Sequence, residues 1–212
     1  MALAMAAAGL GAAEELYGFG KTDETVKSLA LKRIEETLRL SNRSDMLHVT
    51  HALLLLYGRR RHADSTAAAR RGLELNPDYN MALWCLGASQ VFSGDDDGGV
   101  ASATRTVNID IRDPCVHLYS HIVGYGHLGA GRCDEATEWL QKADHLAPGL
   151  PPNLMALAVS RWRSGDKEGG ADVVSRLMQE EPPFVIRTLS QGQRPNALTG
   201  AAAQVAQSLQ WQ

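Results

Sequence analysis

The apolar residues recur with a helical period over most of the chain. Leu83, Leu86 and Gly87 follow one another at i, i+3 and i+4, and the same spacing recurs over residues 154–158. This spacing places the side chains on one face of a helix. The alternation of apolar and polar residues that is typical of a half-buried strand does not occur. The pattern therefore predicts an all-α protein.

The ends of the predicted helices repeat at nearly constant intervals. Pro77 and Ile111 lie 34 residues apart, Ile111 and Pro148 lie 37 apart, and Pro148 and Pro182 again lie 34 apart. Proline ends a helix because it lacks the backbone N–H and its ring clashes with the preceding turn. Such a regular interval indicates a repeat of one supersecondary unit.

Small residues keep the same intervals at three further positions of the repeat. The first position lets a second helix approach closely, the second ends the first helix with a left-handed cap, and the third lies where the two helices cross. The three sets are Gly87, Gly124 and Ala158; Gly94, Gly131 and Gly165; and Ser65, Gly99, Ala136 and Gly170. Each unit is therefore expected to be an antiparallel helix pair.

These units predict a single domain over residues 1–212, a right-handed superhelical α-solenoid. The repeat spacing gives about five helix pairs and a C-terminal helix. In such a stack the core is buried between neighbouring units. Residues 1–44 form a degenerate N-terminal pair and residues 185–212 a tail with a capping helix. The four units between them, over 46–184, are 46–79, 80–113, 117–150 and 151–184.

Four short runs, over 72–77, 82–87, 131–136 and 148–154, carry a family resemblance. They resemble the tetratricopeptide repeat (TPR) segments that follow class III adenylate cyclase or winged-helix domains in bacterial regulators. The resemblance covers residues 29–189, about three quarters of the chain, although Ile111 stands where proline is usual. No cyclase, winged-helix or kinase signature accompanies the repeats. The resemblance therefore implies a sensory or docking role without a catalytic core, in a regulator fragment, a truncated gene product or a stand-alone adaptor.

Composition and charge narrow the class of protein further. Hydrophobic residues make up 44% of the chain, which is enough for a buried core, and the net charge is only -3. So weak a charge gives no reason to expect nucleic acid or an anionic membrane as a partner. Three cysteines without a Cys-x-x-Cys pair indicate reduced thiols in a cytoplasmic protein. Residues 1–13 are apolar but too short to span a membrane, and we interpret them as a helix.

The first helix of each TPR unit is expected to line the concave face of the superhelix. Aromatic side chains on that face would anchor a partner, although each could instead only pack between helices. The predicted ligand-binding residues are His51, Leu54, Trp84, Ala88, Phe92, His121, Tyr125, Met155, Trp162 and Arg163. Thr50, Leu54, Trp84 and Ala88 stand where TPR domains that bind chaperone tails carry a carboxylate clamp. The expected partner is therefore an apolar or aromatic peptide or protein, bound without a cofactor.

A second interpretation stays open at this point. Trp84, His121, Tyr125 and Trp162 could enclose a small apolar or aromatic ligand, with His121 and Tyr125 as catalytic residues if the protein is an enzyme. A groove open along its length would favour the peptide, and an enclosed cavity the small molecule. The pairs His117–His121 and His48–His51 have helical spacing but lack further ligands, so no metal site is predicted.

Three expectations concern the turns and the chain's start. The basic run over 59–62 is expected to be a solvated turn, and Asp97 is expected to cap the helix that follows it. Residues 2–16 have little polar character to cap a solenoid end. We therefore expect homodimer formation through these N-terminal residues.

Overall fold

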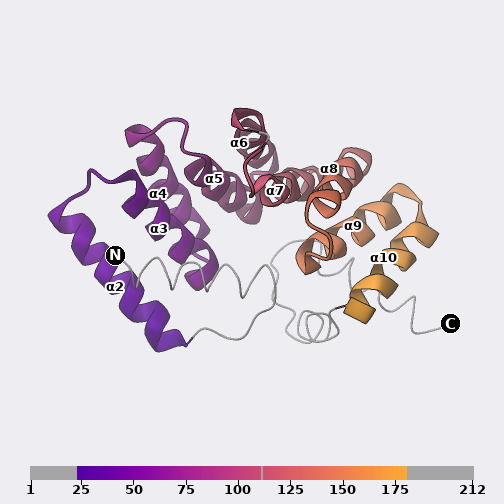
Figure 1. Ribbon diagram of the computed structural model, residues 1–212, viewed down its shortest axis with the longest axis horizontal. Helices are drawn as coiled ribbons and strands as arrows, with labels where there is room; N and C mark the ends of the chain where they lie inside the picture. The colour runs from indigo at the N-terminus through magenta and orange to yellow at the C-terminus, as the bar shows by residue number, and fades with distance from the viewer. Residues whose placement is uncertain (1–22, 111, 181–212) are drawn as a thin grey trace.

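The computed structural model describes residues 23–110 and 112–180, which fold into helices joined by short turns (Figure 1). No strand occurs in this part of the chain. The elements are α2 (Glu24–Leu40), α3 (Asp45–Leu53), the π-helical turn η1 (Leu54–Gly58), α4 (His62–Leu75), α5 (Asn80–Ser93), α6 (Asp96–Ile109), α7 (Val116–Gly129), α8 (Cys133–Leu146), α9 (Pro151–Ser164) and α10 (Lys167–Glu180).

The helices follow one another as antiparallel pairs along a curved stack, as Figure 1 shows from α3 to α10. Helix α3 with η1 pairs with α4, and α5–α6, α7–α8 and α9–α10 form the next three pairs. The predicted all-α solenoid of helix pairs is confirmed. Helix α2 is the second helix of the predicted N-terminal pair. Its partner, the capping helix and the dimerising residues 2–16 lie outside the described residues.

Left-handed glycines end the first helices of the pairs, as the repeat predicts. Gly94, Gly131 and Gly165 have φ angles of 90°, 79° and 100°. After the first two, the next backbone N–H reaches back five residues, from Asp95 to the Gln90 oxygen and from Arg132 to the His127 oxygen, at 2.9 Å each. Glycine takes this conformation at no steric cost, so it stops the helix and satisfies the last carbonyl groups.

Arg60 occupies the corresponding position in the first pair, 34 residues before Gly94. Its φ is 54°, and no other described residue except glycine has a positive φ. The N–H of Arg61 here reaches back six residues, to the Leu55 oxygen at 2.9 Å. The wider turn of η1 takes up the extra residue, so the chain still reverses at the same point of the repeat.

Replacing Arg60 by glycine is expected to raise the free energy of unfolding by about 0.5–1 kcal/mol, because a side chain in the left-handed region costs about 1 kcal/mol or more. Urea unfolding would measure the change. Arg60→Ala is the matched control, since it removes the same side chain but keeps the Cβ atom that causes the strain. Equal stability of the two variants would contradict this account of the turn.

The helices of a pair cross where both carry a small residue. A Cβ atom on Gly87 would lie 3.1 Å from the Gly99 oxygen and 3.1 Å from the Ala103 nitrogen, both in α6. A Cβ atom on Gly124 would lie 2.6 Å from Leu140 Cγ in α8. These approaches let one apolar core continue from α3 to α10. A second cluster of Ala30, Ile34, Leu47 and Leu54 holds α2 against α3 and η1.

Charged side chains at the turns correct one prediction and refine another. Asp97 was expected to cap α6, but the cap is Asp95, whose Oδ1 accepts a hydrogen bond from the Gly98 N–H at 3.2 Å. The prediction for Asp97 is therefore wrong, and its carboxylate pairs with Arg132 at 2.8 Å instead. In the basic turn, Arg59 is only 26% exposed and bonds to Glu24 of α2 at 2.8 Å. This turn therefore helps to fasten α2 to the repeats.

Within residues 23–110 and 112–180, no helix is both long enough and apolar enough to cross a membrane.

Candidate functional site

The predicted binding residues come from the first helix of every pair. His51 lies in α3, Leu54 in η1, Trp84, Ala88 and Phe92 in α5, His121 and Tyr125 in α7, and Met155, Trp162 and Arg163 in α9. Positions four and seven or eight residues apart share one side of a helix. We use the name first-helix face for the set of residues Phe92, His121, Tyr125, Met155 and Trp162, which lie on the first helices α5, α7 and α9.

Ring contacts join α5 and α7 within this face. Phe92 and Tyr125 meet edge to face with their centroids 5.7 Å apart, and Tyr125 meets His121 at 5.6 Å. Such arrangements stabilise aromatic pairs beyond the area they bury. Trp84 instead stacks on Tyr57 of η1 at 5.7 Å, and Trp162 lies 5.7 Å from the Lys167 ammonium group. The structure therefore brings Phe92, His121 and Tyr125 together, while Trp84 and Trp162 have other neighbours.

Burial differs strongly among the predicted binding residues. Trp84 and His121 are each 2% exposed, Tyr125 is 4% exposed, and Leu54 and Ala88 are also buried. The half-buried members are His51, Phe92, Met155 and Trp162, and Arg163 is exposed. The Trp84 indole N–H is buried without an acceptor among the described residues. A partner at the surface of this face would first touch Phe92, Met155 and Trp162.

A buried hydrogen-bonded pair fixes the position of His121. Its Nδ1 lies 3.1 Å from Oδ1 of Asn153 in α9, and Asn153 Nδ2 donates to the Leu140 oxygen in α8 at 2.9 Å. Because this amide oxygen can only accept, Nδ1 of His121 carries a proton and donates it. Asn153 is 0% exposed and was not among the predicted residues. No sequence signal joins the two, since they are 32 residues apart in different helices.

Among the described residues, the cysteines and histidines do not join a cluster of three or more potential metal ligands. Burial raises the pKa of the Cys85 thiol, which keeps this group protonated at neutral pH. Cys85, Cys115 and Cys133 are all free thiols. In the part of the chain that the structure describes, no three His, Cys, Asp or Glu side chains converge as a metal site would require.

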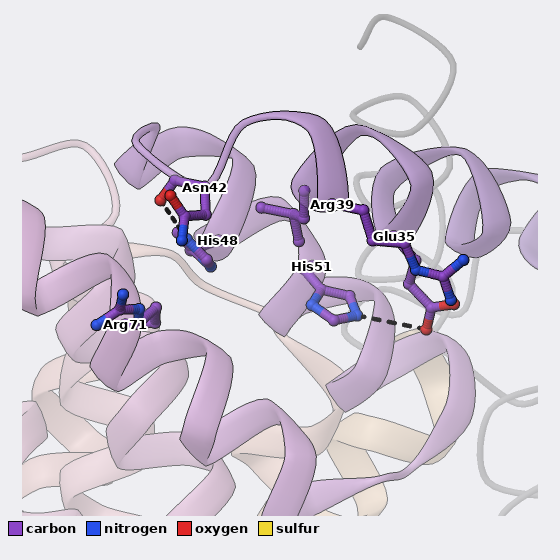
Figure 2. Close-up of a pocket in the computed structure, with 7 residues that line it drawn as sticks. Glu35, Arg39, Asn42, His48, His51 and Arg71 are labelled. Atoms are coloured by element: carbon purple, nitrogen blue, oxygen red, sulfur yellow. Dashed lines mark hydrogen bonds and ion pairs between the residues drawn. The ribbon is translucent and has the colours of Figure 1, made fainter.

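A polar cavity lies apart from the first-helix face, between α2, α3 and α4 (Figure 2). Its volume is about 410 Å³, and its lining residues are Glu35, Leu38, Arg39, Asn42, His48, His51 and Arg71. We call it the histidine cavity. Only His51 was predicted as a binding residue. The spacing of His48 and His51 hinted at a shared face, but nothing in the sequence brings Arg39 and Arg71 toward them.

Both histidines of this cavity lie beside polar groups of α2 or of the turn that follows it. His48 Nε2 lies 2.9 Å from the Asn42 backbone oxygen and donates to it. His51 Nε2 lies 3.7 Å from Glu35 Oε1, which is too far for a hydrogen bond. Burial lowers the pKa of His51, and this outweighs the opposite effect of Glu35. His51 is therefore neutral at pH 7, and its contact with Glu35 becomes an ion pair only in acid.

Comparisons with known proteins bear on the fold. No protein-family model and no curated protein matches the sequence. The solved structure of PilW, a type IV pilus biogenesis factor, is 15% identical with a TM-score of 0.69, over 98% of this chain and 92% of that one. MamA 41-end from Desulfovibrio magneticus RS-1 is 18% identical with a TM-score of 0.63, over 74% and 86%. YrrB, a TPR protein with an unusual peptide-binding site, is 11% identical with a TM-score of 0.56, over 81% and 91%.

The fold is a TPR-like superhelix of antiparallel helix pairs. The comparisons support the TPR part of the resemblance, and they give no support to the narrower likeness to adenylate cyclase and winged-helix regulators. At these identities they describe the shape of the scaffold only. What this chain binds must be argued from its own side chains.

Proposed function

We propose that this TPR protein is a protein- or peptide-binding adaptor without catalysis, and that its partner binds across the first-helix face. The observation that carries the proposal is the ring contact of Phe92 with Tyr125, which backs the partly exposed Phe92 of α5 with a buried aromatic ring of α7. Met155 and Trp162, on the first helix of the last pair, are partly exposed as well. Aromatic anchors on rigid helices bind with little loss of side-chain entropy.

The chemistry of the face favours apolar or aromatic side chains on the partner. Thr50, Leu54, Trp84 and Ala88 supply neither the positive charge nor the amide groups that would hold a free carboxylate. Exposed Arg163, at the end of α9, adds a single positive charge at the rim. YrrB, whose structure is described as that of a TPR protein with an unusual peptide-binding site, supports a peptide as the ligand class. The free thiols of Cys85, Cys115 and Cys133 fit a reducing compartment, the cytoplasm.

The test uses two tryptophans in comparable surroundings. Trp162 in α9 and Trp139 in α8 are both half-buried, and each has a lysine ammonium group near its ring. Peptides selected from a displayed random library, then synthesised, would be titrated by calorimetry. Trp162→Ala should weaken their binding at least about tenfold, close to 1.4 kcal/mol, as for an interface anchor. Trp139→Ala should leave peptide binding unchanged. A larger loss of affinity in Trp139→Ala than in Trp162→Ala would refute the proposal.

A second candidate is a small aromatic ligand held among Trp84, His121, Tyr125 and Trp162, and the buried Trp84 indole N–H without an acceptor favours it. His121 would then position the ligand or act as an acid or base with Tyr125. Saturable quenching of Trp84 by free indole or p-cresol, lost in Trp84→Phe, would support this candidate. Quenching that increases linearly with concentration would eliminate it.

A further inference from the structure

The last described helix, α10, already has a polar outer surface. Its buried Val173, Val174 and Leu177 belong to the main core. Met178 is its one exposed large hydrophobic residue over 167–179, and the other exposed residues there are Lys167, Glu168, Asp172, Ser175 and Gln179. The end of a repeat stack needs a polar outer face, and α10 supplies most of that face itself. Apolar side chains that follow α10 in the sequence therefore have little apolar surface to cover on it.

Residues 195–212, which lie outside the described residues, have the sequence pattern of an uncharged amphipathic helix. They contain no Asp, Glu, Lys or Arg. Their apolar positions follow one another at i, i+4, i+7 and i+11, and are Leu198, Ala202, Val205 and Leu209. Gln204 and Gln207 fall on the opposite face of the predicted helix. Such spacing of apolar residues is typical of helices that bind an apolar surface of a partner.

The first-helix face has the matching chemistry. Helices α5 and α7 contain no Asp, Glu, Lys or Arg, and α7 contacts both α5 and α9. Phe92 of α5 and Met155 and Trp162 of α9 are partly exposed. An uncharged helix that binds here would remove few charged groups from water, whereas binding on the outer surface of α10 would cover charged side chains such as Lys167 and Asp172. The distribution of charge therefore favours the first-helix face.

The dimensions allow this binding within one chain. As a helix, the apolar positions from Leu198 to Leu209 would extend over about 17 Å. Three neighbouring helices that pack 8–10 Å apart extend over about 16–20 Å from the first axis to the third, here from α5 to α9. Residues 181–197 can span up to about 56 Å when extended, and they start from α10, which packs on α9. The segment can therefore reach the first-helix face of its own chain.

We propose that residues 195–212 bind the first-helix face of the same chain and so compete with its peptide partner. This inference rests on the proposed function, because it names a second ligand for the same face. The apolar positions of the segment contact Phe92, Met155 and Trp162. The covalent connection keeps the segment at a high effective concentration, which lowers the apparent affinity for a peptide from outside. Displacement of the segment would then make the adaptor available to its partner.

Two double variants of the whole chain test the proposal. In the apolar-face variant, Val205→Asp and Leu209→Asp place two charges among the apolar positions and should release the segment. In the polar-face variant, Gln204→Asp and Gln207→Asp add the same charge on the opposite face and should leave the segment bound. Urea unfolding curves would verify that the helix pairs stay folded in both variants.

The methyl signals of Met155 and Met178 report by NMR where the segment binds, because these residues lie on α9 and on the outer surface of α10. The apolar-face variant should shift the Met155 signal and leave the Met178 signal unchanged, at any protein concentration. The polar-face variant should shift neither signal. A shift of Met178 alone would place the segment on α10, and a shift that depends on protein concentration would place it on a second copy. Either outcome, or two unchanged signals, would overturn the proposal.

Peptide affinity separates this proposal from the proposed function. Peptides that bind through Trp162 should bind the apolar-face variant at least about tenfold more tightly than the unaltered chain or the polar-face variant. Equal affinities for all three proteins would overturn the competition and leave the peptide site in place. If no selected peptide depends on Trp162, the proposed function fails, and the Met155 signal still decides whether the segment binds.

Discussion

Replacing Gly99 by alanine is expected to lower the free energy of unfolding by about 2–3 kcal/mol, near the upper end of the usual overpacking cost. The new Cβ atom would press against Val91 Cγ2 and lie 2.9 Å from the Gly87 oxygen and 3.0 Å from the Val91 nitrogen. Two of these three neighbours are backbone atoms of α5, so no side-chain rotation relieves the clash. Helices α5 and α6 would have to separate.

Urea unfolding would measure the effect, with Gly58→Ala as the matched substitution. The nearest atom to a Cβ on Gly58 is Leu54 Cδ2, at 4.0 Å, so no clash arises there. Alanine has the higher helix propensity by about 1 kcal/mol, so Gly58→Ala should be neutral or stabilising. If Gly99→Ala were equally neutral, the claim that α5 and α6 cross too closely to admit a Cβ atom would be refuted.

The second large effect is expected at Asn153, where alanine should cost about 3 kcal/mol from lost hydrogen bonds and a new cavity. The Asn153 side chain is 0% exposed and connects three helices, since its oxygen accepts a hydrogen bond from His121 in α7 and its NH₂ group donates one to the Leu140 oxygen in α8. Its removal takes the acceptor away from His121 Nδ1 inside the core. The loss should appear as a lower urea midpoint with an unchanged slope.

A double-mutant cycle isolates the contribution of this hydrogen bond. Asn153→Ala and His121→Ala should couple by about 1–2 kcal/mol, as residues in one hydrogen-bond network do. Asn153→Ala and Ser89→Ala provide the comparison, because Ser89 bonds to Ser65 and to the Cys85 oxygen and not to this network. That pair should be additive within about 0.5 kcal/mol. Coupling of the same size in both cycles would show that the His121–Asn153 bond has no special role.

The helix pairs could be predicted from the sequence because their determinants are local. Gly94, Gly131 and Gly165 end their helices by a backbone conformation that depends on the residue itself. The small residues at Gly87 and Gly99 indicate a close crossing wherever two helices are joined by a short turn. Repetition strengthens each signal, since the same determinant recurs three or four times.

The partners of individual side chains could not be predicted. The spacing of residues along a helix shows which face a side chain lies on, but not how deeply it is buried or which residue of another helix it contacts. Trp84 was placed on the correct helix, yet phase alone could not show that it stacks on Tyr57. His121 was expected to face a ligand, and its bond to Asn153 joins helices from different units. The predicted cap of α6 was wrong by two residues, because the preceding helix ends earlier than expected. Gly94 ends α5 one residue before Asp95, which leaves Asp97 already inside the first turn.

If partners bind across the first helices of the pairs, as we propose, amide hydrogen exchange with a selected peptide will reveal it. The measurement compares exchange of the free and the peptide-saturated protein, helix by helix. Added protection is expected in α5, α7 and α9, with α6 and α8 unchanged. Protection confined to α4, α6 and α8, the second helices, would contradict it.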